Sequence, residues 1–125
     1  MIDSEYCQTM AAYNQWMNQR LYAVCAEISD AERKQDRGAF FKSIHGTLNH
    51  LLYGDRAWLG RFINQPFAPK VIGQELYSDF AELRQAREIC DREIMDWAKR
   101  VSQAWLEQSF TYTSNVDWAA QTCSR

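Results

Sequence analysis

Two charged side chains stand where the helical repeat requires apolar ones. One stripe, with steps of three or four residues, runs through Ile44, Leu48, Leu51, Asp55, Trp58 and Phe62. A second runs through Leu83, Arg87, Cys90 and Ile94. Because an unpaired carboxylate on a buried helix face is costly, Asp55 needs a partner, and Arg87 is the natural candidate. We predict a partly buried structural ion pair; the alternative is that one or both line a pocket and orient a ligand or a metal-binding group.

The two histidines, His45 and His50, are too far apart around a helix to bind one metal together readily. They are five residues apart, which is about 140° on a helix. His45 lies at the edge of the apolar stripe and is interpreted as a boundary residue hydrogen-bonded to a neighbour. His50 projects from the other side, where small residues would let a helix or a ligand approach the imidazole. These small residues are Ser43, Gly46, Gly54 and Ala57.

Common catalytic signatures are absent, including G-x-S-x-G, Gly-rich phosphate loops, dinucleotide fingerprints and H-E-x-x-H. On the residues alone, an exposed or hydrogen-bonded His50 is therefore the ordinary interpretation, since catalytic zinc generally takes three protein ligands. The four cysteines show no C-x-x-C spacing and indicate free thiols in a reducing compartment. Cys25 and Cys90 fall within helical patterns and are expected to be small buried hydrophobes.

Three long amphipathic helices must position these residues. The first spans residues 4–28, the second begins at residue 40 or 41 and ends at 64, and the third runs from 76 to 105 or 106. On the first, apolar residues recur at Tyr6, Met10, Tyr13, Met17, Leu21, Val24 and Ile28. A helical turn after Ser29, a Pro-containing loop at 65–74 and a short strand at 110–113 complete the prediction. Short connections favour an up-down-up arrangement, with the second and third helices antiparallel.

The composition indicates one all-α domain over residues 1–125. The chain is 46% hydrophobic, with 5 Gly and 2 Pro, which is too apolar for disorder and too poor in breakers for an all-β protein. Lys and Arg number 14 against 16 Asp and Glu, with the signs interspersed, so no nucleic-acid or membrane partner is indicated. Neither a membrane span nor a signal segment is present in the sequence, and we expect a cytoplasmic protein.

Three segments resemble the first three helices of the DinB family of metal-dependent helix bundles. They are YNQWMNQRLY (13–22), GAFFKSIHGTLNHLLYGDRAWLGRF (38–62) and LYSDFAELRQAREICD (76–91), and their order and spacing match as well. The resemblance covers about residues 5–113. Its most specific portion is a T-L-x-H-x-x-x-x-D-x-x-W pattern formed by Thr47, Leu48, His50, Asp55 and Trp58.

This resemblance implies an up-down four-helix bundle, often dimeric, that holds nickel or zinc on three histidines. His50 corresponds to the ligand from the second long helix, and the other two belong to an H-x-x-x-H in a fourth helix. After Trp118 the sequence reads AAQTCSR, without histidine. We therefore expect a bundle with the fourth helix missing or truncated and a divalent-metal site that is weak or absent. A truncated chain, a frameshifted gene and a family member that has lost its metal all fit.

The implied function is a divalent-metal-dependent enzyme of the hydrolase or thiol-dependent transferase class, with an incomplete site. In such an enzyme the metal would activate a thiolate or a water. A non-catalytic helical dimer or interaction module is the alternative. Since three amphipathic helices without a fourth leave an apolar seam, we expect a homodimer. The resemblance indicates neither the reaction nor the small-molecule or thiol substrate.

Overall fold

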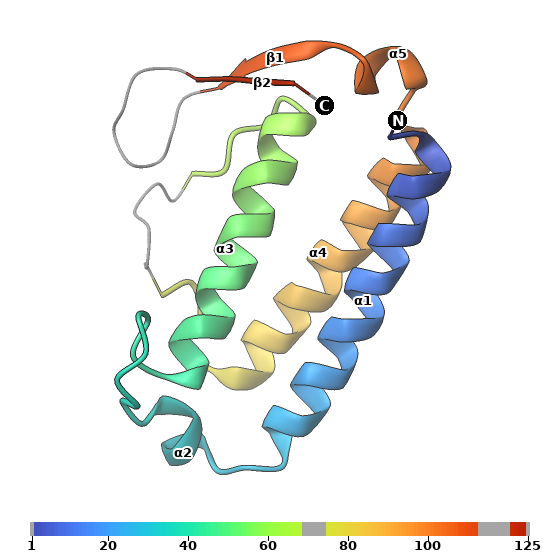
Figure 1. The fold of residues 1–125 in the computed structure, drawn as a ribbon. Helices are drawn as coiled ribbons and strands as arrows, with labels where there is room; N and C mark the ends of the chain where they lie inside the picture. The colour runs from blue at the N-terminus through green and yellow to red at the C-terminus, as the bar shows by residue number, and fades with distance from the viewer. Residues whose placement is uncertain (1, 69–74, 113–120, 125) are drawn as a thin grey trace.

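Three long helices dominate the chain and confirm the all-α prediction (Figure 1). The computed structural model describes residues 2–68, 75–112 and 121–124, the last range as backbone only. The long helices are α1 (Ser4–Ala26), α3 (Ile44–Phe62) and α4 (Phe80–Arg100); the short ones are α2 (Asp30–Lys34) and α5 (Gln103–Leu106). Strands β1 (Ser109–Tyr112) and β2 (Gln121–Ser124) form an antiparallel hairpin. Residues 69–74 of the predicted loop and residue 113 of the predicted strand lie outside the described residues.

Each long helix begins after a polar capping residue. α1 starts where it was predicted, whereas α3 and α4 start later than predicted. The side chains of Asp3, Ser43 and Asp79 accept hydrogen bonds from the first turns of α1, α3 and α4. The second and third predicted helices were therefore too long at their starts. The third was also too long at its end, because extended backbone at Val101 separates α4 from α5, which Ser102 caps.

α3 and α4 run parallel, so the predicted up-down-up arrangement was wrong (Figure 1). Asp55 of α3 contacts Arg87 of α4, and further along both helices Phe62 stacks on Trp97. The physical reason is the connection over residues 63–79. α3 has 19 residues and is about 28 Å long, and about nine extended residues can return along that distance. α1 is antiparallel to α4, since Ser4 Oγ donates to the Ala98 carbonyl.

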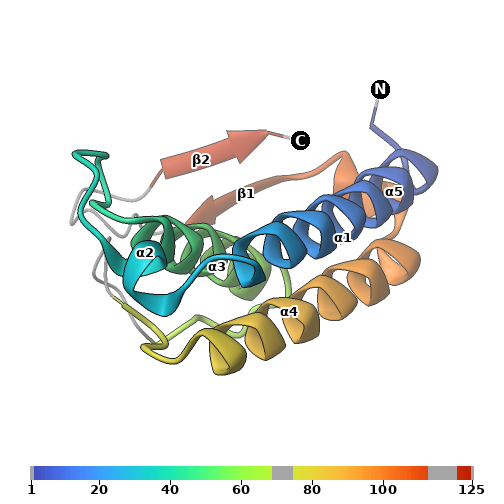
Figure 2. The ribbon, with the colours of Figure 1, turned by 90° about the horizontal axis from the view of Figure 1, so that it is seen from below.

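The hydrophobic core lies where all three long helices converge. It consists of Tyr22 and Cys25 from α1, Leu48 and Leu52 from α3, and Leu83, Ala86 and Cys90 from α4. The prediction that Cys25 and Cys90 are buried is confirmed. α1 packs along α4 for most of its length (Figure 2), whereas α1 and α3 diverge toward the C-terminal end of α3. There β1 packs on α3 through aromatic ring contacts.

The apolar repeat predicted for the first helix is present but exposed. We call six of its residues the α1 stripe, and each is between 39% and 64% exposed: Tyr6, Met10, Tyr13, Met17, Leu21 and Val24. The buried face of α1 is instead formed by Ala11, Tyr22 and Cys25. None of the helices in the described ranges is long and apolar enough to cross a membrane.

Candidate functional site

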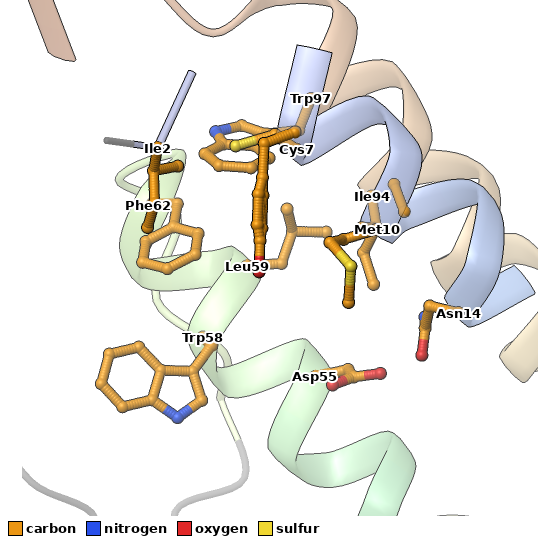
Figure 3. A pocket seen from close by; sticks show the side chains of 12 residues that line it. Ile2, Cys7, Met10, Asn14, Asp55, Trp58, Leu59, Phe62, Ile94 and Trp97 are labelled. Atoms are coloured by element: carbon orange, nitrogen blue, oxygen red, sulfur yellow. The ribbon is translucent and has the colours of Figure 1, made fainter. Parts of the chain in front are cut away.

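An apolar cleft of about 400 Å³ opens between α1 and α3 where the two helices diverge (Figure 3). Met10 of the α1 stripe lies on one wall, and Trp58 and Phe62 of α3 lie on the other. Ile94 and Trp97 of α4 close its floor. A volume of this size is within the range of ligand-binding sites, and its apolar walls would reward the burial of an apolar group.

The ion pair predicted between Asp55 and Arg87 is present at one end of this cleft. Arg87 Nη2 donates to Asp55 Oδ2 at 2.5 Å. The arginine side chain is 3% exposed, whereas that of Asp55 is 40% exposed and lines the cleft. The pair therefore joins α3 to α4, and its carboxylate partner also faces the open space between α1 and α3.

A second carboxylate, Asp91, completes the cluster and was not predicted from the sequence. Arg87 donates to its Oδ1 from Nε at 3.0 Å and from Nη2 at 2.7 Å. Asn14 and Asn18 of α1 donate to the same carboxylate at 3.2 Å. The sequence spacing could have revealed this cluster. Arg87 and Asp91 are four residues apart, and so are Asn14 and Asn18, and residues with this spacing share one face of a helix. The resulting network connects all three long helices.

The cluster carries a surplus negative charge, since two carboxylates face one guanidinium. Burial raises the pKa of Asp91, and the neighbouring Arg87 opposes that shift. For Arg87 itself burial lowers the pKa, but the two carboxylates more than offset it, so the cation is retained. Asp55 Oδ1 and the Asn14 side-chain oxygen accept no hydrogen bond from any described residue. Figure 3 shows these two side chains pointing toward each other at the end of the cleft.

His50 packs against an aromatic ring. Its imidazole stacks on Phe41 with ring centroids 3.8 Å apart, and its Nδ1 is buried without a hydrogen-bond partner among the described residues. The small residue Gly46 explains the approach of Phe41, because a Cβ at this glycine would overlap the Phe41 carbonyl oxygen. The space predicted for a helix or a ligand at this glycine is thus taken by the chain itself.

His45 is hydrogen-bonded, as predicted, but it is fully buried rather than at a boundary. Its Nε2 lies 2.8 Å from the Tyr77 carbonyl oxygen and 3.3 Å from a carboxylate oxygen of Glu75. Asn49, one turn further along α3, accepts hydrogen bonds from the backbone N–H groups of Leu76 and Tyr77 at 2.7 Å and 2.9 Å. Together these side chains anchor the end of the 63–79 connection to α3.

The described residues do not fit the three-histidine metal site that the resemblance implies. His50 is bordered by Phe41 and Tyr53, and no group of three His, Cys, Asp or Glu side chains within 2–68 and 75–112 is arranged to hold a metal ion. Asp55 is five residues from His50, or about 140° around α3. His50 and Asp55, the two candidate residues of the T-L-x-H-x-x-x-x-D-x-x-W pattern, therefore lie on different sides of α3.

These features define an all-α protein whose three long helices share a buried charged cluster beside an open apolar cleft. The family model of the DinB family matches residues 1–125, which is the whole chain. The chain therefore belongs to the DinB family. No curated protein and no solved structure matches it.

Proposed function

We propose that this protein is a non-catalytic helical interaction module that pairs with a second copy of itself through α1. The observation that carries the proposal is the α1 stripe. It extends over the length of the helix, from Tyr6 to Val24, and its most exposed member is Val24 at 64%. Soluble monomers rarely expose long contiguous apolar surfaces, because burying them releases free energy in proportion to their area.

A second α1 suits the space beside the stripe. The residues of the stripe recur every three or four positions, which is the spacing that helix–helix packing requires. Tyr6 and Met10 also line the cleft, so the stripe borders the space between α1 and α3. In a two-fold dimer, α1 of each copy would lie beside α1 and α3 of the other. Both copies would then bury the same surface, as a symmetric dimer requires.

Sedimentation velocity at micromolar concentration tests the proposal. We expect the wild type to sediment as a dimer and Met17→Glu to sediment as a monomer, because two carboxylates would meet close to the two-fold axis. Met17 is 43% exposed, so the substitution leaves the core intact. Ala12→Glu is the matched control, since Ala12 is exposed on the same helix but lies outside the stripe. A monomeric wild type, or equal dimerisation of the wild type and Met17→Glu, would refute the proposal.

A location in the cytoplasm is part of the same proposal. It is supported by the cysteines, because Cys7, Cys25 and Cys90 are free thiols and a reducing compartment keeps thiols unpaired.

A metal-dependent activity is the second candidate, and His50 is the residue that favours it. Its buried Nδ1 has no hydrogen-bond partner within the described ranges, and the chain belongs to the DinB family. Nickel or zinc would then be held by His50 together with ligands from a second copy or from outside the described residues. A thiol-dependent transfer or hydrolysis that disappears with a chelator and in His50→Ala would support this candidate over the module.

A further inference from the structure

The cleft between α1 and α3 has one polar end and one apolar end (Figure 3). Asp55 and Asn14 lie at the polar end, and Phe62 and Trp97 lie at the apolar end. Asp55 and Phe62 are seven residues apart on α3, so the two ends are separated by about 10 Å along the helix. The cleft is therefore long enough for an elongated small molecule that is polar at one end only.

The polar end offers two hydrogen-bond acceptors and a surplus negative charge. Arg87 is shared between Asp55 and Asp91, so one carboxylate charge is not neutralised. The side chain of Asp55 is 40% exposed, and Arg87 donates to its Oδ2 only, which leaves Oδ1 open to the cleft. Oδ1 and the side-chain oxygen of Asn14 point toward each other. A single ammonium group carries several N–H donors and can donate to both of these oxygens.

A second copy packed on the α1 stripe does not supply this cation. Arg20 is the single Lys or Arg residue of α1. It lies about 120° around the helix from Asn14, on the edge of the stripe opposite the cleft. Because a two-fold antiparallel pair of helices brings like edges together, Arg20 of one copy stays away from Asp55 of the other. The cation must therefore come from a separate molecule.

The apolar end fits a hydrocarbon or aromatic group. Phe62 stacks on Trp97 with ring centroids 5.2 Å apart, and Leu59 and Ile94 lie between these rings and Asp55. The volume of about 400 Å³ is within the range of small-molecule sites. Burying an apolar group against these side chains releases free energy in proportion to the area that leaves water. The same walls lower the local dielectric constant and strengthen an ionic contact with Asp55.

We infer that the cleft binds a primary or secondary amine that carries an apolar group. The ammonium donates to Asp55 Oδ1 and to the side-chain oxygen of Asn14, and the apolar group lies against Phe62 and Trp97. An alkylamine is charged at neutral pH, as a lysine side chain is. Every wall of the cleft belongs to one chain. The inference therefore goes beyond the proposed self-association and does not depend on it.

Titration of the wild type with phenylbutylamine tests the inference, followed by tryptophan fluorescence because Trp58 and Trp97 line the cleft. Phenylbutanol keeps the apolar group without the charge, butylamine keeps the charge without the ring, and the trimethylated quaternary ammonium keeps both but has no N–H. We expect saturable binding of phenylbutylamine, about tenfold or more tighter than that of each of the other three compounds. These comparisons use the wild type alone and so do not depend on the folding of a variant.

Two matched variants assign the charge effect to Asp55. Asp55→Asn keeps the shape of the side chain but removes its charge, and it should weaken the binding of phenylbutylamine about tenfold or more while leaving that of phenylbutanol unchanged. Asp96→Asn makes the same change at an exposed position of α4 and should alter neither affinity.

Cys7 reports whether the amine occupies this cleft. It is a free, partly exposed thiol that lines the cleft, so bound phenylbutylamine should slow its alkylation by iodoacetamide, measured by mass spectrometry. Absence of saturable binding, equal affinities for phenylbutylamine and phenylbutanol, or binding that leaves the alkylation rate of Cys7 unchanged would each overturn the inference. None of these results bears on the proposed dimer, which sedimentation without the amine tests separately.

Discussion

Replacing Arg87 by methionine should be among the most damaging single substitutions in this chain. The guanidinium makes three hydrogen bonds, one to Asp55 and two to Asp91. Methionine preserves much of the side-chain volume but removes the charge and every one of these bonds. Asp91, which is 1% exposed, would then keep only the two asparagine donors of α1.

The expected loss of stability is about 3–5 kcal/mol, the range observed when one member of a buried ion pair is removed. Most of it should come from Asp91, because Asp55 can be solvated through the cleft. Asp55→Asn should therefore cost less, about 1 kcal/mol, since Arg87 keeps Asp91 as a partner. Adding Asp91→Asn to Arg87→Met should recover about 2 kcal/mol, because the double variant no longer buries an uncompensated carboxylate.

The stability that Arg87→Met loses relative to the wild type should also depend on pH. Burial raises the pKa of Asp91, and Arg87 opposes that rise, so the substitution moves the native-state pKa further above the unfolded value. Between these two pKa values the native state binds more protons than the unfolded state. Unfolding free energy therefore falls as pH rises through this window, and the deficit should be largest at neutral pH and smaller near pH 4. Tyr22, Cys90 and Asp55 are the other titratable groups that interact with Asp91.

Urea unfolding at pH 7 and at pH 4.5, at one fixed protein concentration, measures these effects. Arg92→Met is the matched control, because it removes an exposed cation from the same helix and should change stability by less than about 0.5 kcal/mol. If Arg87→Met were as stable as Arg92→Met, the cluster would not be buried and the network that joins the three long helices would be wrong. A deficit that grows on acidification would refute the assignment of the cost to Asp91.

Two further predictions concern α3. Asn49→Ala removes three hydrogen bonds to the backbone of Leu76 and Tyr77, and we expect a loss of about 2 kcal/mol in the same urea assay, against a negligible change for the exposed Glu82→Gln. Calorimetric titration of the purified protein with zinc or nickel should show weak binding or none, because His50 has no second or third ligand among the described residues. Tight stoichiometric binding that His50→Ala abolishes would refute this and favour the metal-dependent enzyme.

The sequence predicts the helices and the Asp55–Arg87 pair well because both depend on local periodicity. The pair was correctly predicted although the assumed helix direction was wrong. Both residues lie near the middle of their helices, and the middles of two adjacent helices meet in either orientation. Contacts near the helix ends are different: Asn49 reaches Tyr77, and Phe62 reaches Trp97, only because α3 and α4 run parallel. Periodicity contains no information about direction.

The sequence predicted the apolar repeat of α1 correctly, but it did not show which face of the helix is buried. The α1 stripe is the most regular apolar repeat of its helix, yet the face that packs on α4 is the less apolar one, with Ala11 and Asn14 beside Tyr22 and Cys25. Small and amide side chains allow α1 to approach α4 closely and to donate to Asp91. A hydrophobicity pattern marks the larger side chains, whereas the closest packing here uses the smaller ones.

The charged cluster contains two carboxylates and one guanidinium, and this excess of negative charge has two consequences. Because Arg87 is shared between two carboxylates, it holds α3 and α4 together through Asp55 and reaches α1 through the asparagine contacts of Asp91. For the same reason Asp55 is not fully neutralised and would be expensive to cover with an apolar helix alone. An apolar cleft without such a charge could be covered by any apolar surface. A partner that covers this cleft must instead present a cation or a hydrogen-bond donor to Asp55 together with an apolar surface.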